Sequence, residues 1–191
     1  MRLQGERDDE IAYLRFVTAS LFTFRPLAAS DLTMLHEWLN RPHVAAWWGS
    51  PGSLACVCEE YTGHIESPVV HPYIASLNGV PAAYIQAYHV MQADPAWWHD
   101  ECDPGARGID QFLADESQLG KGLGTRLVHQ FVARLFDVPE VTKVQTDPSP
   151  DNARAIRAYE KAGFRRVGEV TTPDGPALLM VVHRAEFAVR S

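Results

Sequence analysis

A glycine-rich turn between an apolar run and a helical pattern constrains this chain most strongly. Glycines stand at alternate positions, Gly120, Gly122 and Gly124, directly after the stretch 109–118. From Leu123 onward, apolar residues recur at helical spacing, which predicts a helix that begins at the turn. The first N–H groups of a helix have no intrahelical partner, and the helix dipole favours negative charge there. A strand, a turn and a helix start in this order therefore predict a pocket for an anionic group such as a phosphate.

The spacing of the glycines separates this turn from two common phosphate-binding motifs. A Walker loop carries Lys and then Ser or Thr after its last glycine, whereas Lys121 lies between glycines here. The dinucleotide fingerprint needs G-x-G-x-x-G, and this chain has G-x-G-x-G. Glycine still lets a phosphate approach the backbone closely, and Lys121 and Arg126 add positive charge. The turn taken alone is also compatible with a glycine-rich loop that binds nothing.

Two motifs together resemble the acyl-CoA-dependent N-acetyltransferases of the GNAT superfamily. The stretch 118–124 is similar to their Gln-x-Gly-x-Gly-x-Gly loop, with Leu119 where the family usually carries Arg or Gln. The second motif lies about 30 residues downstream and has the form N-x-x-A-x-x-x-Y-x-x-x-G-F. It matches this chain at Asn152, Ala155, Tyr159, Gly163 and Phe164.

A closer resemblance, to the aminoglycoside 6'-N-acetyltransferases, covers roughly residues 22–187. It implies a GNAT fold, an α/β (α+β) domain with a mixed sheet of six or seven strands, at residues 21–191 after an N-terminal extension at 1–20. It also implies acetyl transfer from acetyl-CoA to the 6'-amine of aminoglycoside antibiotics, giving resistance. No His/Cys/Asp cluster in the sequence suggests a metal. The segments that carry this resemblance are 37–40, 47–49, 97–98, 107–111 and 171–176.

Composition narrows the possible classes of function. With 191 residues, 46% of them apolar, the chain is long enough for one domain with its own core. The net charge of −7 disfavours a nucleic-acid-binding protein. No apolar run approaches the ~18 residues of a membrane span, and the N-terminus lacks the pattern of a signal peptide. The three cysteines have no zinc spacing and are interpreted as reduced thiols in the cytoplasm. The expected state is a monomer or a homodimer, and the sequence does not distinguish the two.

Periodicity predicts the order of the remaining elements. Ser30 is a plausible N-cap for a helix that reaches Asn40, and Asn78-Gly79 predicts the turn of a hairpin. Residues 91–104 are polar, aromatic and acidic, which predicts a long loop. Strands are expected at 22–27, 73–77, 80–88, 105–113, 141–146, 164–172 and 176–183, and further helices at 42–48, 54–64, 123–136 and 152–162.

Acetyl transfer to an amine requires a free amine, a polarised thioester carbonyl and a protonated leaving thiol. Asp110 is the candidate base, or the anchor of the reacting ammonium, because a carboxylate in an apolar strand is costly to bury without a cationic partner. A salt bridge to Arg107 or to another base is the alternative. The resemblance gives Tyr159 the role of proton donor to the leaving thiolate, with simple packing as its alternative.

The resemblance also implies the cofactor contacts. A backbone N–H in 112–114 polarises the thioester carbonyl, and the pantetheine arm pairs with the same strand, at Phe112 and Leu113. Asn152 binds the pantetheine amides, with helix capping as the alternative. The pyrophosphate lies on the loop amides, so the cofactor-binding residues also include Gly120, Lys121, Gly122, Leu123, Gly124, Thr125 and Tyr159.

Acidic residues and tryptophans predict the acceptor site. Region 94–116 holds seven acids and one base, an excess suited to a polyamine sugar, although solvated loop charge is the alternative for most of them. Asp147 follows a strand, with an Asx turn as its alternative. One tryptophan of each tandem pair is expected to offer a flat face to a sugar or a cation. The predicted substrate-binding residues are Trp48, Gln86, Tyr88, Trp98, Asp110 and Asp147.

Two rival functions remain open at this point. The acceptor could be another amine, such as a siderophore precursor or a polyamine. Alternatively, the protein could be a non-catalytic sensor that binds an aminoglycoside or an acyl-CoA. The intact Asp110, Tyr159 and glycine loop disfavour the sensor.

Overall fold

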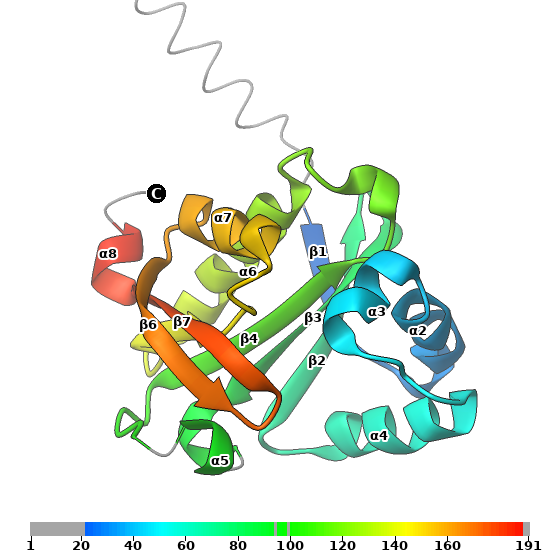
Figure 1. The fold of residues 1–191 in the computed structure, drawn as a ribbon, viewed down its shortest axis with the longest axis horizontal. Coiled ribbons are helices and arrows are strands. Elements are labelled where there is room, and N and C mark those ends of the chain that lie inside the picture. The colour runs from blue at the N-terminus through cyan, green and yellow to red at the C-terminus, as the bar shows by residue number, and fades with distance from the viewer. Residues whose placement is uncertain (1–21, 94, 99, 189–191) are drawn as a thin grey trace, which may run out of the picture.

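One mixed sheet of seven strands organises the molecule (Figure 1). The structure is a computed structural model that describes residues 22–188 except 94 and 99, so the predicted extension 1–20 lies outside the described residues. The strand order is β1-β2-β3-β4-β5-β7-β6. The strands are β1 (Phe22–Pro26), β2 (Val70–Leu77), β3 (Val80–His89), β4 (Ala106–Leu113), β5 (Lys143–Thr146), β6 (Arg165–Thr172) and β7 (Gly175–His183).

The centre of the sheet is where two strands part. β4 and β5 are parallel, whereas the other neighbouring pairs are antiparallel. Their register joins only Ala106–Gly108 to Lys143–Gln145, so within the described residues β4 has no β5 partner from Ile109 to Leu113. That open edge leaves backbone N–H and C=O groups available to a ligand in an extended conformation.

Helices cover both faces of the sheet (Figure 1). Successive residues of β3 belong to opposite cores: Tyr84 packs with α2–α4, and Ile85 packs with α6 and α7. Both side chains are fully buried, and burial of a large apolar side chain contributes about 1.5–3 kcal/mol. The helices are α2 (Leu32–Leu39), α3 (Pro42–Trp48), α4 (Leu54–Glu66), α5 (Pro95–Trp98), α6 (Leu123–Phe136), α7 (Ala153–Lys161) and α8 (Arg184–Ala188).

The predicted elements are present, with two corrections. Ser30 does not cap α2, because it lies inside the 3-10 turn η1 (Ala29–Asp31) and the Asp31 carboxylate accepts from the Ala28 N–H at 2.9 Å instead. The predicted loop 91–104 contains α5 and overlaps the turn η2 (Val90–Gln92). The apolar contacts of Trp98 with Tyr88 and Val90 favour structure there despite the polar composition.

The hairpin turn at Asn78-Gly79 is confirmed. Asn78 and Gly79 have φ of 53° and 81°, the left-handed values of a type I' turn. Among the described residues, no helix is long and apolar enough to cross a membrane.

Candidate active site

The glycine-rich loop forms one wall of an open cleft of about 400 Å³. Gly120 and Gly122 have φ of 75° and 79°, which explains glycine at both positions. Gly122 is also the N-cap of α6, and no side chain caps the helix there. A Cβ on Gly120, Gly122 or Gly124 would meet no protein atom within 4 Å. The glycines therefore keep space open on the cleft side, where the unpaired N–H groups of α6 favour an anion.

The open edge of β4 forms the opposite wall, and two side chains fix its end. His43 Nε2 donates to the Leu113 carbonyl at 3.0 Å, and Arg41 donates to the Ala114 carbonyl at 2.7 Å. The Ala114 N–H is bonded to Ala82 O at 2.8 Å. Because N–H groups of a strand point alternately to its two sides, the Leu113 N–H is directed to the open edge. Of the predicted segment 112–114, Leu113 is therefore the residue suited to polarise a carbonyl.

Most of the predicted cofactor residues line this cleft. They are Phe112, Leu113, Gly120, Gly122, Gly124, Thr125 and Asn152. Lys121 is exposed and Leu123 packs against the core, and neither lines the cleft. Leu119, which replaces the usual polar residue, lines the cleft and packs on the same core. Asn152 Oδ1 accepts from the Ala155 N–H at 3.1 Å, so it caps α7 whether or not it also meets a ligand.

Sequence reasoning missed a row of cations on α7. Arg154, Arg157 and Lys161 are exposed and line the cleft. Their spacing of three and four residues places them along one helix face. The same spacing was readable from the sequence once α7 was assigned. On a chain with a net charge of −7, this row gives the cleft a local positive wall.

Tyr159 lies behind the cleft and does not line it. The ring is buried and contacts Phe164 edge-on, with ring centroids 5.4 Å apart. Burial raises the pKa of the Tyr159 hydroxyl, whereas contacts with the Thr146 and Gln111 side chains act in the opposite direction. The hydroxyl therefore carries its proton at neutral pH, as a proton donor must.

Asp110 lies on the other face of β4 and ends a hydrogen-bonded chain. The Tyr84 hydroxyl donates to Gln86 Oε1 at 2.7 Å, and Gln86 Nε2 donates to Asp110 Oδ2 at 2.9 Å. Gln86 and Asp110 are direct cross-strand neighbours. Burial raises the pKa of Asp110, the Gln86 hydrogen bond opposes this, and the nearby Asp174 raises it further. Unlike a solvated surface acid, Asp110 would gain from a cationic partner.

The predicted alternative, a salt bridge between Asp110 and Arg107, is wrong. Residues three apart in a strand point to opposite faces. Arg107 donates instead to the carbonyls of Pro104 and Ala106, at 3.0 Å each.

Asp147 and Asp174 complete a group of three acids. Asp147 follows β5, and Asp174 lies in the turn between β6 and β7. Burial raises the pKa of Asp147 to about 7, and the charges of Asp110 and Asp174 add to the effect. Asp174 was missed, because only the fold brings this turn close to the end of β5. The described residues hold no group of three or more His, Cys, Asp or Glu side chains placed to bind a metal ion.

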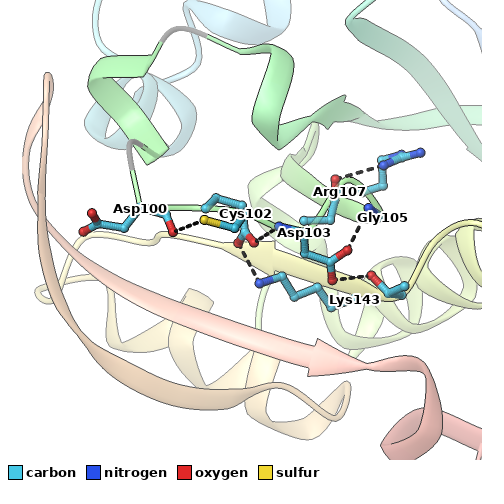
Figure 2. Close-up of polar contacts among 9 residues, drawn as sticks. Asp100, Cys102, Asp103, Gly105, Arg107 and Lys143 are labelled. Atoms are coloured by element: carbon cyan, nitrogen blue, oxygen red, sulfur yellow. Dashed lines mark hydrogen bonds and ion pairs between the residues drawn. The ribbon is translucent and has the colours of Figure 1, made fainter.

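Two acids of the region 94–116 hold the backbone in place and are not free for a ligand (Figure 2). Glu101 forms an ion pair with Lys143 at 2.6 Å. Asp103 accepts from the Thr142 hydroxyl at 2.6 Å and from the Gly105 N–H at 2.8 Å. These contacts attach the segment before β4 to β5. The local acidic excess is therefore partly structural, and Asp94 lies outside the described residues.

The aromatic candidates occupy different positions. Trp48 lines the cleft, and its ring meets Phe112 and Tyr84 edge-on at 5.0 and 5.6 Å. Trp47, which was not selected, is 50% exposed and also lines the cleft. Trp98 is buried, and its indole N–H donates to the Tyr88 hydroxyl at 3.2 Å. The roles of Trp48, Trp98, Tyr88 and Gln86 in binding a substrate stay predictions.

The splayed sheet, the glycine loop at a helix start and the buried tyrosine behind it define the class: a GNAT-type acyl-CoA-binding domain. The family model described as an acetyltransferase (GNAT) domain matches residues 28–172, and the chain belongs to this family.

Particular relatives are similar over most of the chain. A Klebsiella pneumoniae protein named aminoglycoside N(6')-acetyltransferase type 1 is 56% identical over 169 residues, which is 86% of this chain and 84% of that protein. The crystal structure of AAC(6')-Ib with coenzyme A and kanamycin has a TM-score of 0.85 at 56% identity, covering 90% of this chain and all of that one. A lysine N-acyltransferase, MbtK of Mycolicibacterium paratuberculosis, is 31% identical over 79% of this chain and 68% of its own.

Proposed function

We propose that the protein is an aminoglycoside 6'-N-acetyltransferase that uses acetyl-CoA and acts without a metal. The cofactor would enter the cleft with its pyrophosphate on the loop and α6, and with its pantetheine arm along the open edge of β4. The acceptor would lie on the other face of β4, beside Asp110 and Asp147. Two relatives at 56% identity, one named for this activity and one solved with coenzyme A and kanamycin, support the assignment.

The observation that carries the proposal is the placement of acidic and basic groups on either side of one strand. The cleft side has the glycine loop and the row of cations on α7. The other side has Asp110, whose carboxylate accepts a hydrogen bond from Gln86, with Asp174 close enough to raise the pKa of both Asp110 and Asp147. An anionic cofactor and a cationic acceptor are thus each matched by the opposite charge.

Direct attack of the amine follows from this arrangement. Asp110 holds the reacting ammonium, and its proton leaves to Asp110 or to water. The nitrogen attacks the thioester carbonyl. As negative charge develops on the carbonyl oxygen, that oxygen accepts a hydrogen bond from the Leu113 N–H. The C–S bond then breaks, and the thiolate takes the proton of Tyr159.

An assay of thiol release from acetyl-CoA with a panel of amines tests the proposal. We expect turnover with aminoglycosides that carry a 6'-amine and none with analogues that carry a 6'-hydroxyl. Turnover confined to lysine derivatives or to linear polyamines would assign the enzyme to another acceptor. Lysine derivatives belong in the panel because the chain is also similar to MbtK, a lysine N-acyltransferase. Tight binding of an aminoglycoside, with no thiol release from acetyl-CoA in the presence of any amine, would indicate a non-catalytic sensor.

The remaining properties follow from the proposed activity. We place the enzyme in the cytoplasm, where acetyl-CoA is made, as a monomer or homodimer that binds no nucleic acid. The acetyltransferase domain is assigned to residues 21–191. Substrate contacts are assigned to Trp48, Gln86, Tyr88, Trp98, Asp110 and Asp147, with Asp174 added to this set.

A further inference from the structure

One buried acceptor in the cleft has no partner. Gln111 lies between Asp110 and Phe112 on β4 and lines the cofactor cleft. Strand alternation places its side chain on the same face as Ile109 and Leu113, which pack in the core with α6 and α7. Among the described residues, no donor reaches the buried Gln111 Oε1. A buried acceptor left unpaired is destabilising, so the fold keeps this group at a cost that a bound ligand would offset.

The Gln111 side chain also reaches Tyr159. Interactions with the Gln111 and Thr146 side chains lower the pKa of the Tyr159 hydroxyl, against the larger effect of burial. A side chain that favours a phenolate does so by donating a hydrogen bond to its oxygen. If the phenol oxygen accepts hydrogen bonds from both side chains, its own proton is available for a third group. The cleft beyond Gln111 is where that group would lie.

We propose that Gln111 is a positioning residue for the last proton transfer: its amide N–H donates to the Tyr159 oxygen, and its Oε1 accepts an amide N–H of the pantetheine arm. This inference rests on the proposed acetyltransferase function. A single carboxamide would then connect the bound cofactor to the acid that protonates it, so the phenol proton is directed to the sulfur only when the arm is in place.

The proton balance defines what Gln111 contributes. When the C–S bond breaks, its electron pair remains on sulfur, and the proton of Tyr159 moves to that thiolate. The transfer leaves a phenolate in a buried site, where the charged form is disfavoured. The N–H of Gln111 stabilises this negative charge. The phenolate recovers a proton from solvent, which balances the proton that the acceptor amine releases to solvent.

The test is a double-mutant cycle between Gln111→Met and Tyr159→Phe. Methionine keeps the length of the side chain and removes both polar atoms. In the wild-type background, Gln111→Met should lower kcat about 10- to 100-fold, the effect of one hydrogen bond to a charged group, with a change of less than threefold in the acceptor KM. In the Tyr159→Phe background the same change should lower kcat less than about twofold, because no phenolate forms.

Gln130→Met is the matched control. Gln130 Oε1 accepts from the Phe22 N–H at 2.8 Å, away from the cleft, so this change should lower the melting temperature and leave kcat unchanged. A Gln111→Met enzyme with kcat within twofold of wild type would overturn the proposal. An equal loss of kcat in both backgrounds would show that Gln111 does not act through Tyr159, and would overturn it as well.

A spectroscopic measurement separates failure of this inference from failure of the proposed function. The chain has six tyrosines, and ¹³C labelling at Cζ gives one resonance for each, with Tyr159 assigned from the Tyr159→Phe spectrum. Gln111→Met should shift the Tyr159 resonance in the absence of any substrate. An unchanged resonance contradicts the contact, even if the wild-type enzyme is active. A shifted resonance in a protein that acetylates no amine rejects the function and keeps the contact.

Discussion

In the proposed enzyme, the two sides of β4 solve opposite binding problems by different means. The cofactor side is built from backbone: two left-handed glycines, the start of α6 and the open edge of a strand, with exposed cations around them. The acceptor side is built from side chains, in which the buried Tyr84 and the half-buried Gln86 and Asp110 form one hydrogen-bonded chain. Backbone can bind an anion with little desolvation of charge, whereas selection of a polycation needs carboxylates in a costly environment.

This difference predicts where mutations act. On the cofactor side, a substitution that adds side-chain volume should weaken binding more than one that removes a charge, because the glycines provide the room for the ligand. On the acceptor side, lost charge should matter more than lost volume, and it should stabilise the fold while it weakens binding.

The largest expected effect belongs to Tyr159, the group behind the cleft that both sides share. Tyr159→Phe should lower kcat by roughly one to three orders of magnitude, the range of one proton donor, with little change in the Kd of either substrate. Pre-steady-state thiol release and binding calorimetry measure the two quantities. Normal kcat in a folded mutant would leave Tyr159 as a packing residue.

Asp110→Asn should have the next largest effect. The asparagine keeps an oxygen that can accept from Gln86, and the loss of a charge-assisted bond to the acceptor should lower kcat/KM for aminoglycoside about 10- to 100-fold. The Kd of acetyl-CoA should hardly change. Asp137→Asn, at an exposed site after α6, is the control. It should change neither kcat/KM for the aminoglycoside nor the Kd of acetyl-CoA. If kcat falls and the acidic limb of the pH–rate profile moves, Asp110 is a base, and a raised KM alone makes it an anchor.

Sequence alone located the strand, loop and helix of the cofactor side because these depend on local periodicity and glycine spacing. Only part of the acceptor side could be predicted from sequence, because this side depends on which distant residues the sheet brings together. Asp174 reaches the site from a hairpin turn; segment 171–176 contributes to the family resemblance, but nothing in it marks Asp174 as a ligand-binding acid. Glu101 and Asp103 resembled ligand-binding acids. In the structure, however, Glu101 forms an ion pair with Lys143, and Asp103 accepts a hydrogen bond from the Thr142 hydroxyl.

The third prediction concerns stability and pH. The pKa of Asp147 is raised to about 7 in the folded protein, above its unfolded value near 4. The unfolded state therefore releases this proton more readily, and stability is lost as pH rises through the interval from about 4 to 7. Asp147→Asn should remove that loss and raise the melting temperature by roughly 3 °C or more at pH 8, with a smaller gain at pH 5.

Thermal melts at both pH values measure this, with aminoglycoside KM in parallel. The same mutant should bind acceptor more weakly, so stability and binding move in opposite directions. A melting temperature that is equally unchanged at pH 5 and pH 8 would contradict the raised pKa.

The smallest expected effect tests the cofactor side by volume alone. Gly124 lies in the first turn of α6 with a negative φ and lines the cleft, and a Cβ there meets no protein atom within 4 Å. Gly124→Ala should therefore stabilise the helix by a few tenths to about 1 kcal/mol. The same methyl group would occupy the cleft where we propose that the pyrophosphate binds, so the acetyl-CoA KM should rise several-fold while kcat at saturation is retained. Gly63→Ala in α4 is the matched control, since it is exposed, helical and equally free of Cβ contacts. It should give the stability gain without the change in KM. If both variants leave the acetyl-CoA KM unchanged, the cofactor does not approach the loop backbone, and the contrast between the two sides of β4 fails on the side where the sequence was most explicit.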